Sequence, residues 1–127
     1  MQCFPRASPM TTIWGAALLS PPFSTLSYLA PGCFRDSELQ PGMRFLAPVA
    51  NSLRVVMLVR SGTEPVLDAE GRPVPLKPLL WPLERTPLLG RDYLDMVEQL
   101  ALRQLQTVGQ ILGSLLPLPL RSAQVRL

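Results

Sequence analysis

Proline is the feature of this sequence that most restricts its fold. Fifteen of the 127 residues are proline, more than twice the usual share of ~5%. A proline inside a helix removes a backbone donor and clashes with the preceding turn, so this density argues against a helical bundle. The chain is also 47% hydrophobic, which is too apolar for a disordered tail. We therefore expect one small domain in which prolines end or interrupt strands.

Short apolar runs separated by turn signals predict strands in the first part of the chain. They cover residues 12–19, 25–30, 43–47 and 53–60, and the last run has β-branched residues at its centre. Residues 61–75 are rich in proline and glycine and predict a loop with a hairpin tip at 68–71. Residues 76–84 are apolar but contain two prolines, which predicts an edge strand.

The last third of the sequence changes to helical spacing. Apolar residues recur at every third or fourth position and acidic residues occupy the opposite side, which predicts a helix over about 91–104. Thr107 is placed to cap a second, shorter helix that ends at Pro117. Gly109 and Gly113 lie in this helix and indicate close packing rather than a dimer inside a membrane.

Together these patterns predict an α+β fold, a small twisted sheet or open barrel followed by two packed C-terminal helices. The domain is expected to cover residues 12–120. Residues 1–11 have no period and are expected to be a disordered leader, with Met10 as an alternative start. Residues 121–127 are expected to be a tail or the start of a linker.

Several kinds of chemistry are excluded by composition. The chain has no histidine, so histidine-based acid–base catalysis and serine–histidine triads are impossible. Cys3 and Cys33 are too few for a four-cysteine zinc site or a multi-bridge scaffold. Neither a phosphate-binding glycine loop nor a nucleophile with its base is present. Asp92 and Asp95, near a helix start, are expected to be surface residues, so we expect no cofactor and no metal.

Charge and hydropathy bear on partners. The formal charge is +3, and Lys77 is the only lysine among 12 basic residues, so nucleic acid is permitted as a partner but not required. The longest apolar run near the start, residues 13–19, is far short of the ~20 residues that span a bilayer. We expect a cytoplasmic protein without a membrane partner.

Several short motifs follow one another in order after Met10. They are LSYLAP at 26–31, QPGMRFLAP at 40–48, LKPL at 76–79, TVGQIL at 107–112 and LPLPLR at 116–121. Their order and spacing resemble the N-terminal domain of the primosomal protein N′ (PriA) family, the bacterial replication-restart helicases. This resemblance covers nearly the whole chain after Met10.

The resemblance implies a DNA-binding module that recognises the 3′ end of the nascent leading strand at stalled or abandoned forks. The positions that correspond to the family's terminal-nucleotide pocket are Leu26, Ser27, Ala50 and Lys77, with Tyr28 beside them. The family has an aromatic residue, an aspartate and a glycine at the first three positions, so only the lysine matches. Leucine has no π-face for base stacking, worth roughly 1–3 kcal/mol per base, and serine lacks the carboxylate. Both residues also have a structural interpretation that competes with a role in the pocket. Lys77 would be a solvated surface residue, and Tyr28 would be a core residue.

The resemblance also implies partners and a cellular place. The full-length family is an ATP-dependent 3′–5′ DNA helicase, but this chain lacks ATPase and nuclease motifs, so we expect a non-enzymatic domain associated with the nucleoid. Its expected partners are branched DNA with a 3′-hydroxyl end, the remaining helicase domains, single-strand-binding protein and other primosome proteins. The alternative is a protein-interaction module of the primosome with a degenerate end-binding pocket.

Overall fold

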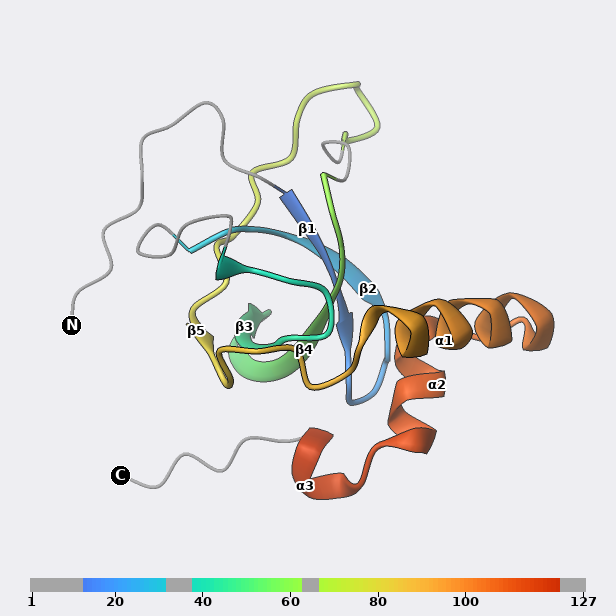
Figure 1. The fold of residues 1–127 in the computed structure, drawn as a ribbon. Helices are drawn as coiled ribbons and strands as arrows, with labels where there is room; N and C mark the ends of the chain where they lie inside the picture. Colours follow the sequence, from blue (N-terminus) through green and yellow to red (C-terminus); the bar gives the residue numbers. More distant parts are fainter. Residues whose placement is uncertain (1–12, 32–37, 63–66, 122–127) are drawn as a thin grey trace.

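The computed structural model describes residues 13–31, 38–62 and 67–121. Within these ranges, five strands form one antiparallel sheet in the order β2-β1-β4-β3-β5. The strands are β1 (Ile13–Leu18), β2 (Thr25–Leu29), β3 (Arg44–Val49), β4 (Ser52–Ser61) and β5 (Trp81–Pro82). The helices α1 (Arg91–Gln104), α2 (Val108–Leu115) and α3 (Leu118–Arg121) follow the sheet (Figure 1). The α+β fold is confirmed, and the predictions for the leader and the two cysteines lie outside the described residues.

The central strands β1 and β4 are buried on both faces, because side chains alternate between two apolar clusters. The inner cluster lies on the face without helices and consists of Trp14, Ala16, Leu18, Tyr28, Ala30, Leu39, Met43, Phe45, Ala47, Val56, Leu58 and Leu79. The helix-side cluster consists of Ala17, Leu19, Val55, Met57, Val59, Leu94, Val97, Ala101, Ile111, Leu112 and Leu116. This double burial explains why residues 55–59 are apolar without interruption.

The sheet curls so that its two edges approach one another, but it is not closed into a barrel. The segment from Lys77 to Pro82 contacts both edges. The Leu79 amide donates to the Leu29 carbonyl of β2 at 2.9 Å, and the Leu80 amide donates to the Leu46 carbonyl of β3 at 2.9 Å. Next to β2 this segment forms only an isolated bridge, between Leu29 and Pro78.

Two strand predictions were wrong in extent. The predicted edge strand over 76–84 is a strand only at Trp81–Pro82, because prolines 78 and 82 cannot donate to a ladder. The predicted strand over 43–47 continues through Pro48 to Val49. In β3, the carbonyls of Arg44 and Leu46 face away from β4 and accept from the segment after Leu79. Because every second residue of a strand faces the same way, Pro48 also faces away from β4. Its lack of an N–H therefore removes no hydrogen bond between β3 and β4.

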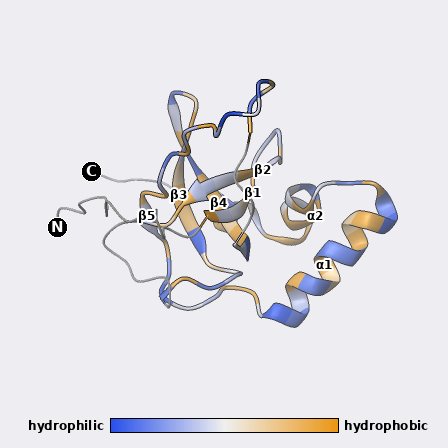
Figure 2. Cartoon of the chain, turned by 90° about the horizontal axis from the view of Figure 1, so that it is seen from above, coloured by the Kyte–Doolittle hydropathy of each residue, from blue (hydrophilic) through white to orange (hydrophobic). Residues whose placement is uncertain are grey.

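The two predicted helices are confirmed. α1 spans Arg91–Gln104 and buries Leu94, Val97 and Ala101 against the sheet, and Figure 2 shows hydrophobic and hydrophilic bands alternating along it. At the start of α2, the backbone N–H of Gln110 donates to the Thr107 hydroxyl at 3.1 Å. In return, the backbone N–H of Thr107 donates to the side-chain oxygen of Gln110 at 2.9 Å. These two bonds form a capping box.

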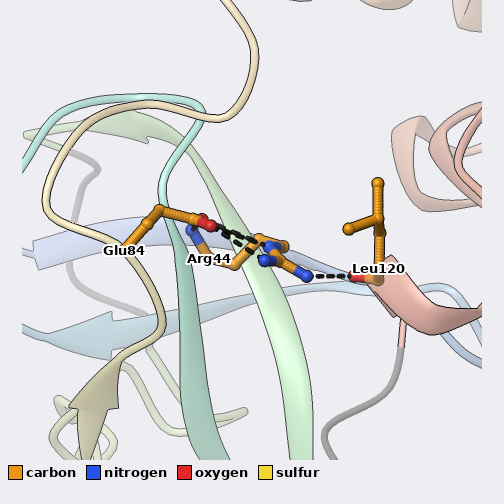
Figure 3. A network of polar contacts seen from close by, with 3 residues as sticks. All are labelled: Arg44, Glu84 and Leu120. Atoms are coloured by element: carbon orange, nitrogen blue, oxygen red, sulfur yellow. Dashed lines mark hydrogen bonds and ion pairs between the residues drawn. The ribbon is translucent and has the colours of Figure 1, made fainter.

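A third, short helix was not predicted. α3 contains Pro119 and ends at Arg121, which the sequence assigned to the tail. An arginine of β3 holds it to the sheet, because Arg44 donates to the Leu120 carbonyl at 2.7 Å and forms an ion pair with Glu84 at 2.9 Å (Figure 3). None of the helices in the described ranges is long and apolar enough to cross a membrane.

Candidate nucleic-acid interface

The candidate residues from the sequence centre on β2, an edge strand of the sheet. Alternation places Leu26 and Tyr28 on the inner face, where Tyr28 belongs to the inner cluster and Leu26 packs against it. Ser27 is half-buried and points to the opposite face. The three neighbours therefore cannot line one pocket with their side chains.

Tyr28 is a core residue, as the structural interpretation predicted. Its side chain is only 3% exposed, and its hydroxyl donates to the Pro48 carbonyl at 3.0 Å. Burial of the phenol raises the pKa of Tyr28 above its usual value of 10.0. The hydrogen bond joins β2 to β3 across the curled sheet, which positions the strand beside the β3–β4 turn.

The backbone of β2 is open on its outer side at Ser27. The Leu29 amide and carbonyl both bond to the Lys77–Leu79 segment, away from β1. Because every second residue of an antiparallel strand faces the same way, the Ser27 N–H and C=O also point away from β1. They have no partner among the described residues. A donor and an acceptor without a partner in the described ranges therefore lie side by side on the edge of β2.

Lys77 lies at the end of this open edge. Its carbonyl accepts from the Leu29 amide at 3.0 Å, so its backbone is beside the last residue of β2. Its side chain is exposed, and no ion pair involves it in the part of the chain that the structure describes. Ser27 is two residues from Leu29 along β2, a separation of roughly 7 Å between these two residues.

Ala50 lies in the turn between β3 and β4 and not on β2. It occupies the turn between Val49 and Ser52, which pair with each other, and it has a left-handed φ of 52°. The turn is connected to β2 through Pro48, the acceptor of the Tyr28 hydroxyl. The structure thus places Ser27 on β2 and the Lys77 backbone beside the last residue of the same strand, whereas Ala50 lies in the β3–β4 turn.

Sequence reasoning missed Arg54 of β4. Its guanidinium Nη1 donates to the Ser20 hydroxyl at 3.1 Å and to the Pro21 carbonyl at 2.8 Å, in the turn that leads into β2. The available signal was an arginine at the start of a continuous apolar strand.

The described residues contain no group of three or more carboxylate and thiol side chains that could hold a metal ion.

No known protein-family profile matches the chain, and no curated protein is significantly similar to it. The resemblance to the primosomal family therefore depends on the order and spacing of its short motifs alone.

Proposed function

We propose that this chain is a DNA-binding module of a replication-restart helicase that recognises the 3′ end of a nascent leading strand at stalled or abandoned forks. The observation that carries the proposal is the open backbone at Ser27 next to the exposed Lys77. This arrangement offers a neutral donor and acceptor pair beside a single positive charge.

The chemistry of this edge suits a hydroxyl better than a phosphate. A terminal 3′-hydroxyl is both a donor and an acceptor, so it can bond to the Ser27 carbonyl and amide together. A 3′-phosphate offers mainly acceptor oxygens and negative charge, which the Ser27 carbonyl repels. The Lys77 ammonium is a suitable partner for the phosphate that links the last two nucleotides.

The turn at Ala50 supports the resemblance on which the proposal depends. Its φ of 52° lies in the region that glycine adopts without steric cost. The primosomal family has glycine at the corresponding position. A backbone that suits glycine is thus retained where the sequence has alanine.

The test compares partial duplexes that differ only in a 3′-hydroxyl or 3′-phosphate end, measured by fluorescence anisotropy at low salt. We expect tighter binding of the hydroxyl end, and Lys77→Gln should weaken it about tenfold. Arg103→Gln, in the exposed last turn of α1, removes the same charge far from β2 in sequence and should leave the preference unchanged. Equal binding of the two ends would contradict the proposal.

A second candidate function is a protein-interaction module, favoured by exposed leucines at the end of α1. Leu102 is 78% exposed and Leu105 is 94% exposed, which is unusual for large apolar side chains so close in sequence. Single-strand-binding protein or the other helicase domains are the proposed partners. A Leu102→Ser and Leu105→Ser double variant should lose such a partner in a pull-down while keeping its binding to DNA ends.

A further inference from the structure

The open part of the β2 edge consists of Thr25 and Ser27. The Ser24 carbonyl, just before this strand, accepts from the last residue of β1 at 2.9 Å, so the even-numbered residues point their backbone groups toward β1. The odd-numbered residues therefore point theirs away from β1. Leu29 bonds on that outer side to the Lys77–Leu79 segment. Thr25 and Ser27 have no backbone partner there within the described ranges.

The five residues of β2 carry none of the features that protect the edge strand of a sheet. Their sequence, TLSYL, contains no proline and no charged residue, and their pairing with β1 has no bulge. The opposite edge of the sheet is protected, because β5 has only two residues and one of them is Pro82. An unprotected edge is a template for pairing with another strand. In the described sheet, β2 is therefore the edge that can accept a further strand.

The spacing of the two open residues makes this edge complementary to a second copy of itself. When two β2 strands pair antiparallel about a two-fold axis at Leu26, Thr25 of one copy lies opposite Ser27 of the other. Both residues point outward, so each pair exchanges both of its N–H···O=C bonds. Leu26 then lies opposite its own counterpart on the inner face, where it already packs against the inner cluster. A second copy supplies this match by symmetry alone.

The neighbouring chain restricts the pairing to this register. A shift by two residues in one direction would place Thr25 opposite Leu29, whose outward groups already bond to the Lys77–Leu79 segment. A shift in the other direction would require the Phe23 amide, which already donates to the Ser20 carbonyl in a turn where φ of Phe23 is 60°. The interface is therefore short, and small interfaces are typical of weak, reversible complexes.

We propose that the chain forms a weak two-fold dimer through its β2 edges, and that this dimer competes with the 3′ end of DNA for Ser27. The dimer itself does not depend on the proposed function. The competition rests on it, because the Ser27 N–H and C=O cannot bond to a second strand and to a 3′-hydroxyl at the same time. Dimerisation therefore lowers the apparent affinity for DNA ends as the protein concentration rises.

Sedimentation velocity over a series of concentrations tests the dimer with variants of Thr25, a residue that the proposed DNA site does not use. Thr25→Pro removes an N–H that has no partner in the described part of the chain, as an edge strand tolerates. It should raise the dissociation constant of the dimer about tenfold or more and keep the preference for a 3′-hydroxyl end. Thr25→Val is the matched control, because it keeps the N–H of an exposed residue and should leave the dimer unchanged.

Amide hydrogen exchange of the wild-type protein does not depend on how a variant folds. Exchange at Thr25 and Ser27 should slow as the protein concentration rises, and exchange at Leu26, whose amide faces β1, should change much less. A protein that stays monomeric at about 1 mM, or a dimer that forms equally in Thr25→Pro and Thr25→Val, would overturn the inference without affecting the proposed function.

Adding an oligonucleotide with a 3′-hydroxyl end tests the competition. It should dissociate the dimer and restore fast exchange at Thr25, whereas the same oligonucleotide with a 3′-phosphate should do so less. A dimer that persists while the oligonucleotide is bound would overturn the competition for Ser27. If the protein forms the dimer but binds no oligonucleotide, the proposed function and the competition fail together, and the β2 dimer stands.

Discussion

Ala50 has a backbone conformation that an L-amino acid rarely adopts. Its φ is 52° in the turn between β3 and β4, where a Cβ atom crowds the following carbonyl and costs roughly 1–2 kcal/mol. Glycine removes this crowding but loses more chain entropy on folding. We therefore expect Ala50→Gly to raise the free energy of unfolding by about 0.5 kcal/mol, measured by urea titration.

The control for this substitution is Ala69→Gly. Ala69 is exposed in a turn and is not among the described residues with a positive φ. Glycine at this position brings only the entropic cost, so it should be neutral or slightly destabilising. An Ala50→Gly variant that is less stable than Ala69→Gly would contradict the strain assigned to the turn.

The buried phenol of Tyr28 makes stability depend on alkaline pH. Its pKa is raised in the folded protein from the usual 10.0, so the unfolded chain loses this proton first as pH rises. Stability from this group is complete below about pH 10 and is lost as pH rises through the folded-state pKa. Denaturant titrations on both sides of pH 10 should show this loss in the wild type.

Two phenylalanine variants isolate the contribution of Tyr28. Tyr28→Phe removes the titrating group and should flatten the alkaline loss. It should also lower stability at neutral pH by about 1 kcal/mol, because the hydrogen bond to Pro48 is absent. Tyr93→Phe, in the exposed part of α1, keeps Tyr28 and should retain the alkaline loss. An unchanged pH profile in Tyr28→Phe would show that another group is responsible.

Gly109 and Gly113 of α2 both pack closely against neighbouring groups, but an added methyl group is harder to accommodate at Gly109 than at Gly113. A Cβ atom at Gly109 would lie 2.5 Å from the carbonyl oxygens of both Leu18 and Phe23. A Cβ atom at Gly113 would lie 2.7 Å from the Phe23 ring, which is a side chain and can rotate. We expect Gly109→Ala to lower the melting temperature much more than Gly113→Ala, with a loss of about 3 kcal/mol against about 1 kcal/mol.

One result for these two variants would contradict the prediction. Alanine favours helix over glycine by up to ~1 kcal/mol, so without close packing both substitutions would stabilise α2. Equal stabilisation by Gly109→Ala and Gly113→Ala, measured by thermal unfolding, would contradict the contact of this helix with Leu18 and Phe23.

Elements with local signals could be predicted from the sequence. α1 has a helical period, so its bounds were predicted accurately. Thr107 forms a capping box with Gln110, three residues away, and so the start of α2 was predicted as well. The extent of β3 depends instead on which side of Pro48 has a neighbouring strand. This is a property of the assembled sheet. α3 also depends on the assembled fold, because its Leu120 carbonyl accepts from Arg44, which is 76 residues away in the sequence.

In the candidate interface too, some residues could be recognised from the sequence and others only from the assembled sheet. The sequence already offered the interpretation of Tyr28 as a core residue, and Lys77 stood out as the only lysine. The open backbone at Ser27 and the position of Arg54 follow from how β1, β2 and β4 pair. They could not be predicted before the strand order was known.

At the scale of the whole molecule, a single buried leucine helps hold the two edges of the curled sheet together. Leu79 is 2% exposed in the inner cluster, and the chain on either side of it bonds to β2 and to β3. Leu79→Ala should cost about 2–5 kcal/mol. It should also speed hydrogen exchange at the Leu29 amide, which bonds to Lys77, and at the Leu80 amide, which bonds to Leu46.

The neighbouring Leu80→Ala variant separates this role from a general loss of apolar surface. Leu80 is 41% exposed, so its truncation should cost less than about 1 kcal/mol and leave exchange at the Leu29 amide unchanged. If Leu79→Ala speeds exchange at the Leu80 amide but not at the Leu29 amide, the segment holds only the β3 edge. The Lys77 side of the proposed interface would then have to be positioned by other contacts. Faster exchange at both amides, with binding of the 3′-hydroxyl end weakened in parallel, would link the curl of the sheet to the placement of Lys77 beside Ser27.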